Sequence, residues 1–70
     1  MRYVVVIERA DDGSYSAYVP DLPGCVSCGE TADEARQLIT EAIALHIASL
    51  RQHGETVPEP STLTDVVEAA

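Results

Sequence analysis

Three short stretches near the N-terminus carry the hydrophobic patterns of β-strands. Arg2–Arg9 is a β-branched run bounded by charges, which is typical of a strand covered on both faces. Ser14–Val19 alternates apolar and polar residues with a period of two, as a strand with one wetter face does. Cys25–Cys28 is a shorter third candidate. Turn signals separate the three, namely the Asp12-Gly13 pair and the PDLPG segment, whose prolines remove backbone donors.

The next segment has the three- and four-residue spacing of an amphipathic helix. Thr31 and Glu34 form a capping-box pair at its start, and Gly54 is a stop signal at its end. Leu45 and several alanines widen the apolar stripe beyond what one small sheet needs. We therefore expect a second buried surface, either between copies or against a partner, with Leu45, His46 and Leu50 as candidate contacts between copies. The stripe itself consists of Ala35, Leu38, Ile39, Ala42, Ile43, Ile47 and Leu50.

The C-terminal part begins with an extended connector, Glu55–Thr62, because Pro58 and Pro60 block continuation of the helix. Leu63–Ala70 is ambiguous: its two adjacent valines favour a strand, whereas its polar residues and terminal alanines allow a helical turn. We expect the strand. The pattern as a whole predicts one α+β domain over residues 1–70, with β-β-β-α-β order and the long helix packed on one face of an antiparallel sheet.

The net charge of the chain limits the classes of partner that it can bind. The chain has four arginines, no lysine and twelve carboxylates, for a formal net charge of −8. We expect no unaided binding to DNA or RNA, because such binding requires clustered cations that neutralise the phosphates. An acidic surface suits a basic partner, although it could also serve only to keep a small protein soluble. The sequence has no leader-like start and no apolar run of about 20 residues, so we expect a soluble cytoplasmic protein.

The Cys25-x-x-Cys28 pair is the most conspicuous candidate for metal or redox chemistry. A zinc site needs four ligands, but His46 and His53 are about 10.5 Å apart along a helix. Residues three apart in a strand also point to opposite faces. A redox thiol is normally placed at a helix start, and here the helix begins later, at Thr31. We therefore read both cysteines as small buried residues, expect no metal or cofactor, and read Asp11, Asp12 and Asp21 as turn residues.

The order of these motifs is similar to that of the HicB family of antitoxins, over roughly Arg2 to Ser61. The strand YVVVIER is followed by DDGSYSAYVPDLPGC, then by GETADEA at the helix start and by PEPS after the helix. The resemblance implies a reduced RNase H-like fold and a non-enzymatic inhibitor that forms dimers or higher oligomers. It also implies a partner, the small basic toxin HicA, which has a double-stranded-RNA-binding fold and cleaves mRNA with a histidine. The residues that match the family pattern are read as turn and cap residues: Gly13, Pro20, Asp21, Leu22, Pro23, Gly24, Gly29, Thr31 and Glu34.

Charge and turn positions, rather than the family pattern, suggest where a toxin would bind. We expect an acidic rim near the turns, formed by Asp11, Asp12, Asp21, Glu30, Asp33 and Glu34. Many HicB antitoxins also carry a C-terminal module that binds their operator. This sequence has no basic segment and leaves no room for such a module before Ala70, so we expect no DNA binding by this chain. Two other hypotheses stay open: a stand-alone oligomeric structural or regulatory module without a toxin, and a nuclease on the RNase H-like scaffold.

Overall fold

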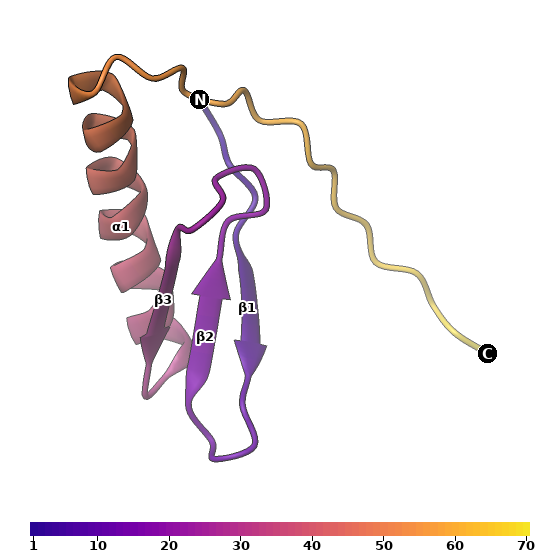
Figure 1. Cartoon of the computed structure of the whole chain (residues 1–70). Helices are drawn as coiled ribbons and strands as arrows, with labels where there is room; N and C mark the ends of the chain where they lie inside the picture. The colour runs from indigo at the N-terminus through magenta and orange to yellow at the C-terminus, as the bar shows by residue number, and fades with distance from the viewer.

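A three-stranded antiparallel sheet and one long helix make up the ordered body of the protein (Figure 1). The structure is a computed structural model that describes residues 1–70. The strands follow one another in space as they do in sequence, and α1 lies across one face of the sheet. This α+β arrangement confirms the predicted order of three strands followed by a helix. The elements are β1 (Val6–Arg9), β2 (Tyr15–Tyr18), β3 (Val26–Gly29) and α1 (Ala32–Gln52).

β1 and β2 are shorter than predicted because pairing, rather than composition, determines where a strand ends. Val6 pairs with Tyr18 at one end of the β1–β2 ladder, and β2 stops there. Residues 2–5 therefore continue β1 without a partner strand beside them, although they were predicted to belong to it. β3 begins one residue later than expected, so that Cys25 lies outside the strand and Gly29 lies inside it.

The predicted fourth strand is absent. No helix or strand follows Gln52, and residues 63–70 lead away from the sheet as an extended segment (Figure 1). Leu63, Val66 and Val67 are 93%, 95% and 83% exposed. A β-branched sequence forms a strand only when a neighbouring strand satisfies its backbone groups, and this segment has no such neighbour within the chain.

The hydrophobic core lies between the sheet and the first half of α1. Only seven of the 70 residues are buried, which is a small core even for a chain of this length. Leu22, from the loop between β2 and β3, and Ile39, from α1, are its two largest fully buried side chains. The apolar members of the core are Ala17, Val19, Leu22, Cys25, Ala35 and Ile39.

The predicted capping box and helix stop are both present. The Thr31 hydroxyl accepts a hydrogen bond from the Glu34 amide at 3.0 Å. The Glu34 carboxylate reaches one residue further back than expected and accepts from the Glu30 amide, also at 3.0 Å. At the other end, Gly54 adopts a φ of 70°, and its amide donates to the Arg51 carbonyl. α1 does not combine the length and the apolar character that a membrane-spanning helix needs.

Gly29 is a point of close approach between the sheet and α1. A Cβ atom at this position would lie 2.7 Å from the Ala35 amide nitrogen and 3.0 Å from the Glu34 Cβ. A side chain is thus excluded by the backbone of the first helical turn. The glycine that the sequence motif placed between β3 and the helix is required for this close approach.

Candidate functional site

Five of the six predicted acidic rim residues lie at one end of the sheet. The β1–β2 turn carries Asp11 and Asp12, and the β3–α1 junction returns to the same end because β3 is antiparallel to β2. Asp12 and Glu30 line the same shallow hollow, together with Gly13 and Ser14. The two segments that build this end, residues 10–14 and 30–34, contain no cation. We call this surface the acidic end; its members are Asp11, Asp12, Glu30, Asp33 and Glu34, all exposed.

Two carboxylates of the acidic end are also structural. Asp12 accepts hydrogen bonds from the Ser14 hydroxyl at 2.6 Å and from the Ser14 amide at 2.9 Å. These bonds, the hydroxyl first, stabilise the charged form and hold the pKa of Asp12 below its ordinary value. Glu34 caps the helix through the Glu30 amide. Asp11, Glu30 and Asp33 are therefore the members whose carboxylates are free to meet a partner without loss of an internal contact.

Asp21 lies at the opposite end of the sheet, so it does not form one rim with the other five residues, and its role in toxin binding stays a prediction. It follows β2, whereas Asp12 precedes that strand. Its carboxylate binds the connector after α1: the amides of Ser61 and Thr62 each donate to it at 3.0 Å, and both hydroxyls donate as well. The Thr62 amide and hydroxyl, followed by the Ser61 amide, lower the pKa of Asp21 to about 2.

This anchor should be sensitive to acid. Because the folded pKa of Asp21 is depressed from 3.8 to about 2, its contribution is fully present above about pH 4 and is lost as the pH falls through 2. NMR of the Ser61 and Thr62 amide shifts against pH should give a common midpoint near the lowered pKa. Asp21→Asn should abolish that titration, and a midpoint at the ordinary carboxyl value would contradict the anchor.

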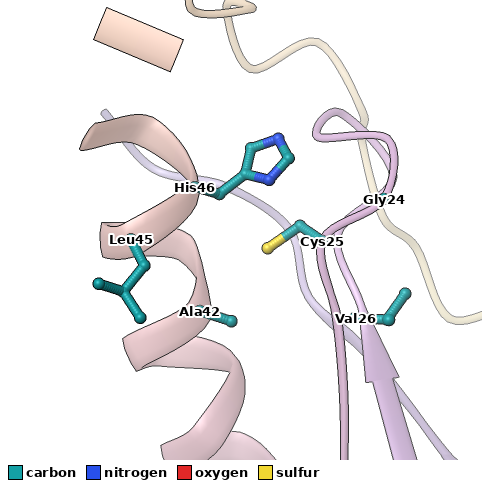
Figure 2. A pocket seen from close by; sticks show the side chains of 6 residues that line it. All are labelled: Gly24, Cys25, Val26, Ala42, Leu45 and His46. Atoms are coloured by element: carbon teal, nitrogen blue, oxygen red, sulfur yellow. The ribbon is translucent and has the colours of Figure 1, made fainter. Parts of the chain in front are cut away.

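The two cysteines have different surroundings. Cys25 is buried in the core and Cys28 is exposed, which confirms that they point to opposite sides but corrects the reading of both as buried. Burial raises the pKa of the Cys25 thiol and so disfavours the reactive thiolate. His46 lies over Cys25, beside Ala42 and Leu45, in a shallow hollow between α1 and the β2–β3 loop (Figure 2). No three His, Cys, Asp or Glu side chains lie close enough together to hold a metal ion.

The candidate self-contact residues lie on the later turns of α1. Leu45 is 72% exposed, whereas His46 and Leu50 are half-buried. Figure 2 shows Leu45 directed away from the Cys25 sulfur, toward the outside of the helix. Their role in contact between copies stays a prediction.

Two features of the surface escaped the sequence patterns. The first is the link between Asp21 and the connector, which joins residues 40 and 41 positions apart. Its only local signal is the Ser-Thr pair after Pro60, a poor guide to so distant a partner. The second is a cross-strand row of Val6, Tyr18 and Val26 on the sheet face opposite α1, which becomes visible only once the strand register is known.

Comparison with known proteins places this geometry in a family. Residues 3–70 match the model for the "HicB_like antitoxin of bacterial toxin-antitoxin system". A UPF0150 protein of Thermoplasma acidophilum is 42% identical over 69 residues, which cover 99% of this chain and all of that protein. Antitoxin HicB of Escherichia coli is 32% identical over 63 residues, which cover 90% of this chain and 46% of that protein. The chain thus spans about half the length of that antitoxin.

A solved structure shows the same fold. The crystal structure of the N-terminal domain of Burkholderia pseudomallei antitoxin HicB superposes with a TM-score of 0.74 at 39% sequence identity. The match covers 83% of this chain and 69% of the solved chain. Together with the match over residues 3–70, this shows that the chain belongs to the family of HicB-like antitoxins of bacterial toxin–antitoxin systems.

Proposed function

We propose that this protein is an antitoxin that binds and neutralises a small basic mRNA-cleaving toxin of the HicA kind. The observation that carries the proposal is the match of nearly the whole chain to the antitoxin family. On this view it acts as a non-enzymatic inhibitor that covers the toxin's RNA-binding surface. The net charge of −8 supports the role, because a surface complementary to an RNA-binding protein should itself be negative.

The acidic end is the surface that we propose contacts the toxin. It gathers five carboxylates from the β1–β2 turn and from the β3–α1 junction with the first turn of α1, and residues 10–14 and 30–34 contain no arginine. Such a surface attracts a basic partner over distances comparable to the Debye length, about 8 Å at physiological salt. Three of its members, Asp11, Glu30 and Asp33, can be changed without removing a carboxylate that accepts an internal hydrogen bond.

A charge-reversal experiment tests this assignment. The triple variant Asp11→Lys, Glu30→Lys, Asp33→Lys should bind the basic toxin about 10- to 100-fold more weakly at low salt, and the difference should shrink as salt is added. The matched control, Glu41→Lys, Glu55→Lys, Glu59→Lys, makes the same change in net charge on α1 and the connector. Calorimetric titration against the purified toxin, together with an RNA-cleavage assay, measures both effects.

The possible outcomes distinguish the choice of the acidic end as the binding surface from the antitoxin role itself. Equal losses in both triple variants would show that net charge matters and the acidic end does not. If the unaltered protein neither co-purifies with nor inhibits a basic toxin encoded by a neighbouring reading frame, the antitoxin role itself fails. That result would favour the second candidate, a stand-alone oligomeric module, which the exposed apolar residues on α1 and after the connector also suit.

A further inference from the structure

The N-terminal segment Arg2–Arg9, which ends in β1, has apolar side chains on both faces although it lies at the edge of the sheet. β1 pairs with β2 alone, and its other side is open. Ile7 pairs with core residue Ala17, whereas Val6 pairs with Tyr18, which is 40% exposed on the opposite face. Residues 3–6 are half-buried and Ile7 is 37% exposed. Runs that are apolar on both faces are typical of interior strands, and an unprotected edge is a template for pairing with another strand.

A second unpartnered element leaves the molecule close to this edge. We call residues 63–70 the tail. Its root is held in place, because Ser61 and Thr62 bind Asp21 and the Tyr3 hydroxyl donates to the Pro58 carbonyl. Beyond Thr62 the tail runs out from the sheet (Figure 1). Its three large apolar side chains, Leu63, Val66 and Val67, are more than 80% exposed.

We propose that the tail of one copy pairs with the free edge of β1 in a second copy, as a fourth strand of that copy's sheet. The segment Arg2–Arg9 and the tail are both eight residues long, about 26 Å when extended. In a strand, Leu63 and Val67 would face one side of the sheet and Val66 the other, so the tail supplies apolar contacts to both faces of β1.

Charge supports the same pairing. Two of the four arginines of the chain, Arg2 and Arg9, flank the apolar part of the β1 segment. The tail carries Asp65 and Glu68 and no cation. Opposite charges on neighbouring strands stabilise the pairing and help to select its partner.

Two observations indicate that the tail pairs with β1 of a second copy and not with β1 of its own chain. Each copy offers one tail and one free β1 edge, so two copies exchange tails and close with two-fold symmetry. The chain's own tail diverges from its own β1 (Figure 1). Exchange would also remove the most exposed apolar side chains from water in a protein that buries only seven residues by itself.

Sedimentation of the 70-residue chain tests the exchange. We expect a dimer at tens of micromolar for the unaltered chain. A chain truncated after Thr62 and the double variant Val66→Asp, Val67→Asp should each raise the dimer dissociation constant by at least about tenfold. The matched control is Ala44→Asp, Ala48→Asp, which adds the same charge to exposed positions of α1 and should leave the dimer intact.

Amide hydrogen exchange identifies the edge involved. Protection of residues 3–9 should rise with protein concentration in the unaltered chain and not in the truncated one. A monomeric unaltered chain, a dimer that survives truncation, or a dimer broken only by the α1 variant would overturn the proposal. Protection that depends on the tail but not on concentration would also overturn it, because the tail would then pair with its own β1.

Discussion

Replacing Ile39 with alanine should lower the free energy of unfolding by about 2–5 kcal/mol. Ile39 is fully buried and is one of the two largest side chains in the core. Its removal deletes three methyl or methylene groups and leaves a cavity between α1 and the sheet, which collapses only in part. Domains of this size are marginally stable, so a loss of that size should leave the protein partly unfolded at 37 °C.

Leu38→Ala is the matched control, because Leu38 adjoins Ile39 on the same helix but is 39% exposed. Leu38→Ala should lower the free energy of unfolding by less than about 1 kcal/mol. Urea unfolding at one fixed protein concentration measures both, since any association between copies adds a concentration-dependent term. If Ile39→Ala unfolds the protein outright, Ile39→Val, with an expected cost of about 0.5–1.5 kcal/mol, keeps the comparison quantitative. Equal losses at positions 38 and 39 would contradict the location of the core.

Placing a methyl group at position 29 should be the second most damaging change. The Cβ of Gly29→Ala would lie 2.7 Å from the Ala35 amide nitrogen and 3.1 Å from the Glu34 carbonyl carbon. Both are backbone atoms of the first helical turn, so the clash can be relieved only by moving the helix. We expect the free energy of unfolding to fall by about 1–3 kcal/mol. The smaller conformational freedom of alanine in the unfolded chain offsets at most about 1 kcal/mol of it.

The neighbouring Cys28→Ala is the control for this prediction. Cys28 is exposed on the same strand, and its replacement should change stability by less than about 0.5 kcal/mol. The displaced helix should also weaken the bond between the Glu30 amide and the Glu34 carboxylate, which NMR of the Glu30 amide would report. An unshifted Glu30 amide with full stability in Gly29→Ala would show that the sheet and helix are not in such close contact.

The packing of α1 on the sheet also affects the proposed function, because it positions the carboxylates of the acidic end. Gly29 and the capping box place Glu30, Asp33 and Glu34 at the end of the sheet where the β1–β2 turn brings Asp11 and Asp12. The proposed toxin surface therefore depends on the packing of the first turn of α1 against β3. Loss of toxin binding in Gly29→Ala without any loss of charge would be the expected sign of that dependence.

Local patterns in the sequence were enough for the order of the elements and for much of their chemistry. The Asp12-Gly13 turn, the Thr31–Glu34 cap and the Gly54 stop depend on contacts within a few residues, and each is found as predicted. The acidic composition and the motif order were likewise readable, and they led to the family that the comparisons show.

Tertiary structure alone decided what depends on contacts between distant segments. The two-residue period of a strand does not say where its partner stops, so only the register shows that β1 begins at Val6. Strand propensity in Val66 and Val67 could not supply the missing neighbour, and the tail stays unpaired within the chain. Asp21 reads as one more turn carboxylate until folding brings Ser61 and Thr62 to it from about 40 residues away. Backbone pairing and long-range hydrogen bonds belong to pairs of segments, and a pattern along one segment cannot specify them.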